Sequence, residues 1–248
     1  MTLDEFFQIH PKAALGFSGG VDSSYLLHAA VQSGADVRPY FIRTPFQPLF
    51  EFEDAMRFAE TEGVHMTVID YDILRCEAVA ENHADRCYHC KRALFSLLKD
   101  RAVRDGYTLL IDGTNASDDA GDRPGMRALQ ELAVRSPLLE CGMTKSDIRR
   151  LSAEAGLFTW DKPAYACLAT RIPTGTRLTP EVLARVEQAE AVLFQMGFRD
   201  FRVRVFHEAA RIQLTEADLP RALGQRCTLL QQLSRWFETV LLDMNTRE

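Results

Sequence analysis

The sequence has no long hydrophobic run and no excess of positive charge. Across its 248 residues no apolar stretch approaches the roughly 18 residues of a membrane span. The first residues also carry no basic segment of the kind that opens a secretory signal. The formal net charge of −6 gives no electrostatic reason to expect a nucleic-acid partner. We therefore expect a cytoplasmic protein that binds neither membranes nor nucleic acid.

Cysteine is also scarce. The six cysteines are too few and too irregularly spaced for a disulfide framework: Cys76, Cys87, Cys90, Cys141, Cys167 and Cys227. We expect them to be thiols, metal ligands or catalytic groups. Hydrophobic residues make up 46% of the chain and charged residues 26%, which are globular proportions and exclude intrinsic disorder. The length suits one full domain and a small second one.

Short apolar runs alternate with segments of helical periodicity over the first two thirds of the chain. This pattern is typical of βαβ units and predicts an α/β fold with a doubly wound parallel sheet. The predicted strands are residues 13–17, 37–42, 66–71, 107–112 and 137–139, and the predicted helices are 22–32, 51–62, 91–104, 123–134 and 147–155.

A second, smaller unit is predicted beyond a long irregular segment. That segment covers residues 158–177, and after it we predict a helix at 179–196, strands at 200–206 and 210–214, and a helix at 229–243. The sequence thus predicts a first domain at residues 1–176 and a small C-terminal α/β domain at 177–248.

A glycine-containing loop joins the first predicted strand to the helix that follows. It reads Ser18-Gly19-Gly20-Val21-Asp22-Ser23-Ser24. Adjacent glycines let backbone amides converge, the serines add hydroxyl donors, and the helix N-terminus adds a positive partial charge. The loop therefore predicts an anion site made by Ser18, Gly19, Gly20, Asp22, Ser23 and Ser24. It is not a Walker A loop, because no Gly-Lys-Ser/Thr follows.

A second polar cluster follows the fourth predicted strand, at the sheet edge where open α/β folds bind ligands. It reads Asp112-Gly113-Thr114-Asn115-Ala116-Ser117-Asp118-Asp119, with Asp122-Arg123-Pro124-Gly125 just beyond. We assign Gly113, Thr114, Asn115, Asp122 and Arg123 to nucleotide binding. The cluster alone could be an Asx-rich turn, and Asp122 and Arg123 could be a surface cap. Candidate Mg²⁺ ligands are Asp22 and an acidic residue within 118–122.

Three cysteines have settings that favour the thiolate. Cys87 and Cys90 form a Cys-x-x-Cys pair at the start of a predicted helix with basic neighbours, and Cys167 lies near Lys162 and Arg171. Cations and a helix N-terminus lower the pKa of a thiol, and the thiolate is the form that attacks an activated carboxyl group or binds iron. The pair could also be half of a structural zinc site, although no second pair completes the coordination.

The loop at residues 18–24 resembles that of the PP-loop ATP pyrophosphatase family, whose Ser-Gly-Gly-x-Asp-Ser pattern it matches without a departure. The resemblance implies an adenine nucleotide α-hydrolase-like fold that uses ATP and Mg²⁺. It also implies that the loop holds the β,γ-pyrophosphate while a substrate oxygen attacks the α-phosphate. Pyrophosphate then leaves and an adenylate forms.

Further motifs resemble the LarE family of ATP-dependent sulfur transferases, which help to build the nickel-pincer cofactor. They are Asp112-Gly113-Thr114-Asn115, Asp122-Arg123-Pro124-Gly125, Lys145 with the helix start after it, and residues 162–173. The likeness runs from about residue 13 to residue 214. It implies that the carboxylates of pyridinium-3,5-biscarboxylic acid mononucleotide are adenylated and then converted to thiocarboxylates.

The LarE resemblance also implies where the sulfur comes from. The position of the family's sulfur-donating cysteine is Cys167, and we assign Asp22 and Arg171 to catalysis beside it. In other members three cysteines hold a [4Fe-4S] cluster that carries an extra sulfide. The matching residues here are Cys87, Cys90 and Cys167, and we favour this cluster type.

The predicted small domain carries Glu190 on its helix, and Arg202 and Arg204 on one face of a strand. Solvated surface charge would explain these arginines. The resemblance instead implies that they contact the substrate phosphate or a subunit interface, with Glu190 paired to them or touching the substrate. It also suggests a homo-oligomer, such as a hexamer. The alternative functions are a tRNA thiolase of the same PP-loop class and a non-catalytic ATP-binding module.

Overall fold

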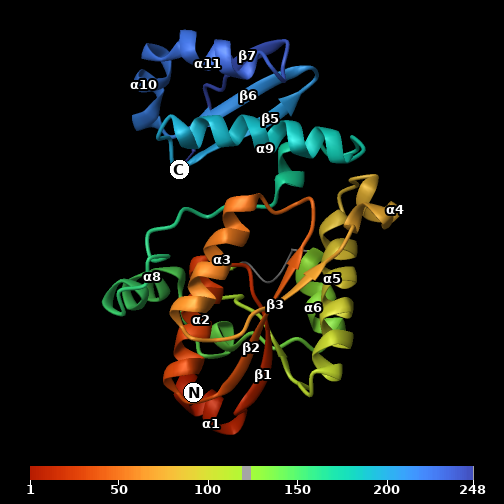
Figure 1. Cartoon of the computed structure of the whole chain (residues 1–248), viewed down its shortest axis with the longest axis vertical. Helices are drawn as coiled ribbons and strands as arrows, with labels where there is room; N and C mark the ends of the chain where they lie inside the picture. Colours follow the sequence, from red (N-terminus) through yellow and green to blue (C-terminus); the bar gives the residue numbers. More distant parts are fainter. Residues whose placement is uncertain (119–123, 248) are drawn as a thin grey trace. The chain divides into compact units, whose positions relative to one another are not determined.

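The chain folds into two compact units, which the computed structural model in Figure 1 shows. The first unit comprises Met1–Arg75 and Asp85–Ala164, and the second comprises Cys76–Ala84 and Tyr165–Glu248. The structure describes residues 1–118 and 124–247. Within these ranges no helix has both the length and the apolar character that a membrane crossing requires.

The first unit is built on a parallel four-stranded sheet in the order β3-β2-β1-β4. Its strands are β1 (Lys12–Gly16), β2 (Asp36–Arg43), β3 (Thr67–Asp70) and β4 (Leu110–Ile111). Its helices are α1 (Leu3–Ile9), α2 (Val21–Gln32), α3 (Leu49–Thr61), α5 (Arg86–Arg104), α6 (Pro124–Glu131), α7 (Pro137–Glu140) and α8 (Lys145–Glu154), with the 3-10 turn η1 (Ile73–Arg75). Strands β2 and β3 extend the sheet on one side of β1, and β4 lies on the other side. The carboxyl ends of β1 and β4 therefore border the crevice where such sheets bind ligands.

The alternation of side chains along β1 explains why helices cover both faces of this sheet. Ala13 and Leu15 belong to a core with α1, α2 and α3, whereas Ala14 belongs to a second core with Leu98 of α5. Figure 1 accordingly shows α2 and α3 on one side of the sheet and α5 and α6 on the other. The predicted doubly wound α/β fold is confirmed.

The second unit holds a separate three-stranded sheet in the order β5-β6-β7. β5 (Phe201–Phe206) runs antiparallel to β6 (Ala209–Leu214), and β6 pairs in parallel with β7 (Thr239–Leu242). The helical elements of this unit are α4 (Glu77–Ala80), η2 (Leu168–Arg171), α9 (Pro180–Gln195), η3 (Glu216–Asp218), α10 (Leu219–Gly224) and α11 (Arg226–Leu233). Helix α9 begins as predicted, since Thr179 accepts from the Val182 amide and Pro180 stands in the first turn.

Two predicted elements are wrong. Residues 137–139 form helix α7 rather than a strand, because Pro137 suits the first turn of a helix and its carbonyl accepts from the Cys141 amide. The helix predicted at 229–243 stops at Leu233, and the chain continues as β7. There the open edge of β6 supplies partners for a run that starts with the β-branched Thr239 and Val240.

The boundary between the units also differs from the predicted one at 176/177. Residues 76–84 and 165–176 fold with the second unit. Hydrogen bonds hold these two segments to each other: the Gly175 amide donates to the Asn82 carbonyl at 2.8 Å, and the Asn82 side chain donates to two carbonyls of the later segment. Such pairing between distant parts of the chain leaves no mark in local composition.

Candidate active site

The loop after β1 is a tight turn closed by its own serines. Ser18 Oγ lies 3.0 Å from Ser23 Oγ, the Gly20 amide donates to Ser18 Oγ at 3.3 Å, and Ser23 Oγ donates to the Gly20 carbonyl at 3.3 Å. Gly19 has a φ of +69°, in the left-handed region that favours glycine. Gly20 caps α2 without a side chain, so the first amides of the helix face the turn. This is the construction of an anion site.

The turn after β4 packs directly against this loop. A Cβ atom at Gly113 would lie 2.9 Å from the Ser23 backbone nitrogen, so the missing side chain lets the two turns meet. The buried Asp112 carboxylate accepts from the hydroxyls of Thr114 and Ser136, both at 2.6 Å, and thereby shapes its turn. The structure thus brings together the two clusters predicted from sequence.

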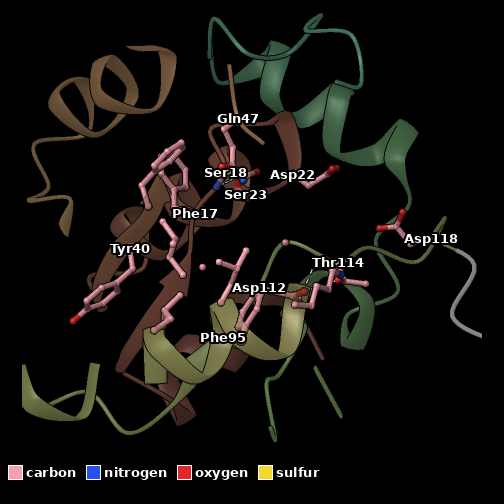
Figure 2. Close-up of a pocket in the computed structure, with 17 residues that line it drawn as sticks. Phe17, Ser18, Asp22, Ser23, Tyr40, Gln47, Phe95, Asp112, Thr114 and Asp118 are labelled. Carbon is pink, nitrogen blue, oxygen red and sulfur yellow. Dashed lines mark hydrogen bonds between the residues drawn. The ribbon is translucent and has the colours of Figure 1, made fainter. Parts of the chain in front are cut away.

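A cavity of about 360 Å³ lies between the two turns, inside the first unit. Figure 2 shows Ser18 and Ser23 on one side of it and Asp112 and Thr114 on the other. The remaining wall is mostly apolar and is lined by Phe17, Tyr40, Ile42, Leu94, Phe95 and Leu98. A polar end beside an apolar wall suits a phosphate chain attached to a flat aromatic base.

Asp22 lines this cavity and is held by an ion pair. Its Oδ2 atom lies 2.5 Å from Nζ of Lys145, the first residue of α8. Its Oδ1 atom is enclosed and has no hydrogen-bond partner in the part of the chain that the structure describes. A carboxylate oxygen without a donor suits a divalent cation, so Asp22 fits its predicted role as a Mg²⁺ ligand. Lys145, which sequence reasoning assigned no role, also belongs to this site.

The other residues predicted for nucleotide binding are differently placed. Ser24 is completely buried, so its hydroxyl is closed to the cavity and is not one of the expected anion donors. Asn115 is also buried. Its side-chain oxygen accepts a hydrogen bond from the Ser117 backbone amide at 2.8 Å, and this bond shapes the turn. Asp118 lines the cavity. Asp122 and Arg123 lie outside the residues that the structure describes.

Cys87 and Cys90 lie at the start of α5, three residues apart and hence on one face of the helix. Cys87 is exposed and Cys90 is half-buried. The Arg86 guanidinium donates to Cys87 Sγ at 3.6 Å, and no side chain caps the helix N-terminus. The structure thus places a cationic neighbour and a helix N-terminus beside this pair, the setting that the sequence predicted.

Cys167 belongs to the second unit and precedes the turn η2. Its carbonyl accepts from the amide and the hydroxyl of Thr170, at 3.0 and 2.8 Å. Arg171 donates to the Ala166 carbonyl at 2.7 Å, and its guanidinium pairs with both oxygens of Glu190 at 2.9 and 3.2 Å. The side chains of Arg171 and Glu190 are 0% and 2% exposed. We expected Arg171 to take part in catalysis, but these contacts are those of a residue that positions the backbone around Cys167.

Arg202 and Arg204 stand on β5. The Arg202 guanidinium lies 5.3 Å from the centre of the Tyr165 ring, and Arg204 donates to the Thr170 carbonyl at 2.9 Å. Burial, together with the charge of Arg171, lowers the pKa of Arg202 to about 10, and burial lowers the pKa of Arg204 as well. Arg202 therefore stays cationic at neutral pH, and it is not solvated surface charge, because it is only 5% exposed.

The three cysteines predicted to hold an iron–sulfur cluster come from both units. Cys87 and Cys90 belong to the first unit and Cys167 to the second. Across residues 1–118 and 124–247, no three His, Cys, Asp or Glu side chains are grouped so as to hold a metal ion. The cluster stays a prediction.

The burial of Arg171 and Glu190 leads to a prediction for stability. We expect Arg171→Met to lower the free energy of unfolding by about 3–5 kcal/mol, because the Glu190 carboxylate loses its counter-charge in a buried position. Urea denaturation followed by circular dichroism measures the change.

The matched control for this variant is Glu208→Gln. It removes one partner of a surface pair with Arg185, in which the Glu208 side chain is 72% exposed. We expect it to change the free energy of unfolding by less than about 1 kcal/mol. If both substitutions lowered the free energy of unfolding by the same amount, the conclusion that the buried Arg171–Glu190 pair contributes more to stability than a surface pair would be wrong.

The sequence is similar to several known proteins, although no family model matches it. It is 36% identical over 248 residues, which is 98% of this chain and 92% of the relative, to an uncharacterised protein of Synechocystis sp.. It is 34% identical over 236 residues, which is 94% of this chain and 86% of the relative, to the pyridinium-3,5-bisthiocarboxylic acid mononucleotide synthase of Lactiplantibacillus plantarum. A tRNA-specific 2-thiouridylase of Thermotoga petrophila is 24% identical over 188 residues, which is 59% of this chain and 52% of the relative.

Proposed function

Because the chain belongs to the LarE family of PP-loop sulfur transferases, we propose that it adenylates the carboxylates of pyridinium-3,5-biscarboxylic acid mononucleotide with ATP and converts them to thiocarboxylates. The likeness to the Lactiplantibacillus plantarum synthase, at 34% identity over 94% of this chain, supports the substrate. The observation that carries the proposal is the cavity between the turns after β1 and β4, with its serine-lined end and apolar wall.

In the proposed adenylation, the loop at residues 18–23 holds the β,γ-phosphates of ATP. A carboxylate oxygen of the substrate attacks the α-phosphorus, the bond from that phosphorus to the bridging oxygen breaks, and pyrophosphate leaves with the electron pair. Pyrophosphate gains negative charge as it leaves, so fixed N–H groups and the N-terminus of α2 stabilise the transition state more than the ground state. Mg²⁺ held by Asp22 supplies further neutralisation of the phosphates.

The apolar wall supports the choice of ATP as the nucleotide. The side chains of Tyr40 and Ile42 from β2 and of Leu94, Phe95 and Leu98 from α5 face the same cavity as the serines. Adenine has flat apolar faces that such side chains cover, while the phosphates reach the loop. The nucleotide thereby brings its α-phosphorus between the two turns.

In the proposed sulfur transfer, the Cys167 thiolate attacks the carbonyl carbon of the adenylate and AMP leaves, which gives a thioester. Loss of the Cα proton and cleavage of the Cβ–Sγ bond then release the thiocarboxylate and leave dehydroalanine at Cys167. If Cys87, Cys90 and Cys167 held a [4Fe-4S] cluster, that cluster would supply a sulfide in place of this sulfur, and the three side chains would stay intact. The Arg86 contact to Cys87 Sγ supports the cluster, because a cluster held by cysteine sulfurs is anionic and a neighbouring guanidinium offsets part of that charge.

Pyrophosphate release tests the adenylation and its acceptor. With ATP, Mg²⁺ and the pyridinium biscarboxylate, the purified protein is expected to release pyrophosphate, and without the acceptor only a background rate is expected. Release with tRNA but not with the mononucleotide would favour a tRNA thiolase. Binding of ATP with no release for either acceptor would favour a non-catalytic module.

Anaerobic purification distinguishes the two sources of sulfur. We expect brown protein that contains iron and sulfide, because a bound iron–sulfur cluster absorbs visible light. Three cysteine ligands would leave one iron of that cluster open to carry an extra sulfide. Cys87→Ala and Cys90→Ala are expected to lose the colour, whereas Cys227→Ala, which changes an exposed thiol outside the proposed ligand set, keeps it. Colourless wild-type protein without iron would assign the sulfur to Cys167 itself.

A further inference from the structure

Lys162 contacts the phosphate-binding loop, although the reaction proposed above gives it no role. Its Nζ atom donates to the Gly19 carbonyl at 3.3 Å and lies 2.8 Å from Asp54 Oδ2 and 3.4 Å from Glu51 Oε1. The Lys162 side chain is only 13% exposed. A lysine ammonium has three donors, and three oxygens surround this one, so it is held in a defined position.

The contact with Gly19 orients an amide of the loop. The Gly19 carbonyl and the Gly20 N–H belong to one trans peptide group and point in opposite directions. With the carbonyl bound to Lys162, the N–H is directed to the other side, where it donates to Ser18 Oγ at 3.3 Å. Ser18 lines the cavity. Lys162 therefore controls which way one of the loop amides faces.

Helix α3 packs directly against the same turn. A Cβ atom at Gly19 would lie 3.0 Å from Ala55 Cβ and 3.2 Å from the Ala55 backbone nitrogen, so the helix touches the glycine directly. Glu51 and Asp54 belong to this helix as well. Two carboxylates beside a loop that binds an anion would repel the ligand, and the single positive charge of Lys162 offsets part of their charge.

We propose that Lys162 is a positioning residue of the phosphate site, which orients the peptide group between Gly19 and Gly20 and offsets part of the negative charge of Glu51 and Asp54. The inference rests on the proposed function, because it takes the loop to be the site of the ATP pyrophosphate. Lys162 acts through the backbone of Gly19 and through the two carboxylates, not by contact with the nucleotide.

Binding of a non-hydrolysable ATP analogue, measured by isothermal titration calorimetry, tests the proposal. Lys162→Met is expected to weaken binding of α,β-methylene-ATP about tenfold, which corresponds to about 1.4 kcal/mol. In pyrophosphate release the variant is expected to raise the KM for ATP more than it lowers kcat, because the lost interaction acts on bound phosphate in both states. Lys162→Arg keeps the charge and the donors and is expected to stay within about threefold of the wild type.

Asp54→Asn provides a second variant that leaves Lys162 in place. Asp54→Asn removes one of the two repelling carboxylates while Lys162 keeps its contact with the Gly19 carbonyl, so analogue binding is expected to be unchanged or tighter. Weaker binding in Asp54→Asn, as large as in Lys162→Met, would overturn the proposal, because it would show that the Asp54 carboxylate supports the ligand site instead of opposing it.

The matched control is Lys12→Met, at the opposite end of β1 from the loop. Lys12 lies 3.7 Å from Asp36 and is 50% exposed, and its loss is expected to leave analogue binding unchanged. If Lys162→Met binds the analogue as tightly as the wild type and Lys12→Met do, the proposal is wrong. If instead the wild-type protein neither binds the analogue nor releases pyrophosphate, the proposed function has failed.

Discussion

Replacing Asp22 by asparagine is expected to lower the rate of pyrophosphate release by at least about a hundredfold, the usual loss when a fixed electrostatic group is removed from a transition state. The asparagine side chain has no negative charge with which to bind the Mg²⁺ that accompanies ATP. It also cannot form an ion pair with Lys145, whose Nζ lies 2.5 Å from Asp22 Oδ2. The amide nitrogen that replaces one of the two carboxylate oxygens also cannot coordinate a metal ion, because it is a donor only. A coupled assay for pyrophosphate at saturating ATP measures the loss.

The control for this experiment is Asp36→Asn. Asp36 pairs with Lys12 and accepts from the Tyr107 hydroxyl at the amino end of β2, away from the carboxyl ends where the loops meet. Its substitution is expected to leave the rate within about threefold of the wild type. Near-normal release in Asp22→Asn would show that the cavity between the two turns is not where ATP reacts.

Replacing Cys167 by alanine is expected to abolish thiocarboxylate formation while pyrophosphate release continues. The groups proposed for adenylation, Ser18, Ser23 and Asp22, belong to the first unit, whereas Cys167 belongs to the second. The adenylate therefore forms, but sulfur no longer arrives, and water hydrolyses it. Mass spectrometry of the mononucleotide product, run beside the pyrophosphate assay, separates the two half-reactions.

Cys227→Ala is the matched control, since it removes an exposed thiol of the second unit. It is expected to leave both half-reactions within about twofold of the wild type. A Cys167→Ala enzyme that also stops releasing pyrophosphate would contradict the assignment of Cys167 to sulfur transfer alone. So would one that still forms thiocarboxylate.

Local sequence was sufficient to predict the loop after β1 and the turn that packs against it. Gly19 needs a positive φ, and Gly113 must lack a side chain where the second turn meets Ser23. Each glycine stands at the end of a strand, and the ends of neighbouring parallel strands share one edge of a sheet. The loop, the second cluster and their proximity therefore follow from short motifs and strand order.

The sequence drew attention to Lys145 as part of a LarE-like motif and to Lys162 as a neighbour of Cys167, but it did not predict their contacts with Asp22 and Gly19. Lys145 lies 123 residues from its partner Asp22, and Lys162 lies 143 residues from Gly19. No periodicity or composition links residues so far apart, because only the folded sheet and its helices bring them together. The same limit explains the missed strand β7, whose partner β6 is not adjacent in the chain.

The segment that carries Cys167 is held through its backbone. Its carbonyls accept from Thr170 and Arg171, and none of these bonds uses the sulfur atom. If the side chain gives up its sulfur, these backbone hydrogen bonds are still available, so we expect a spent molecule to stay folded while its capacity for a second round is gone. An exhausted population would then escape quality control that recognises misfolding, and replenishment would depend on new synthesis rather than repair.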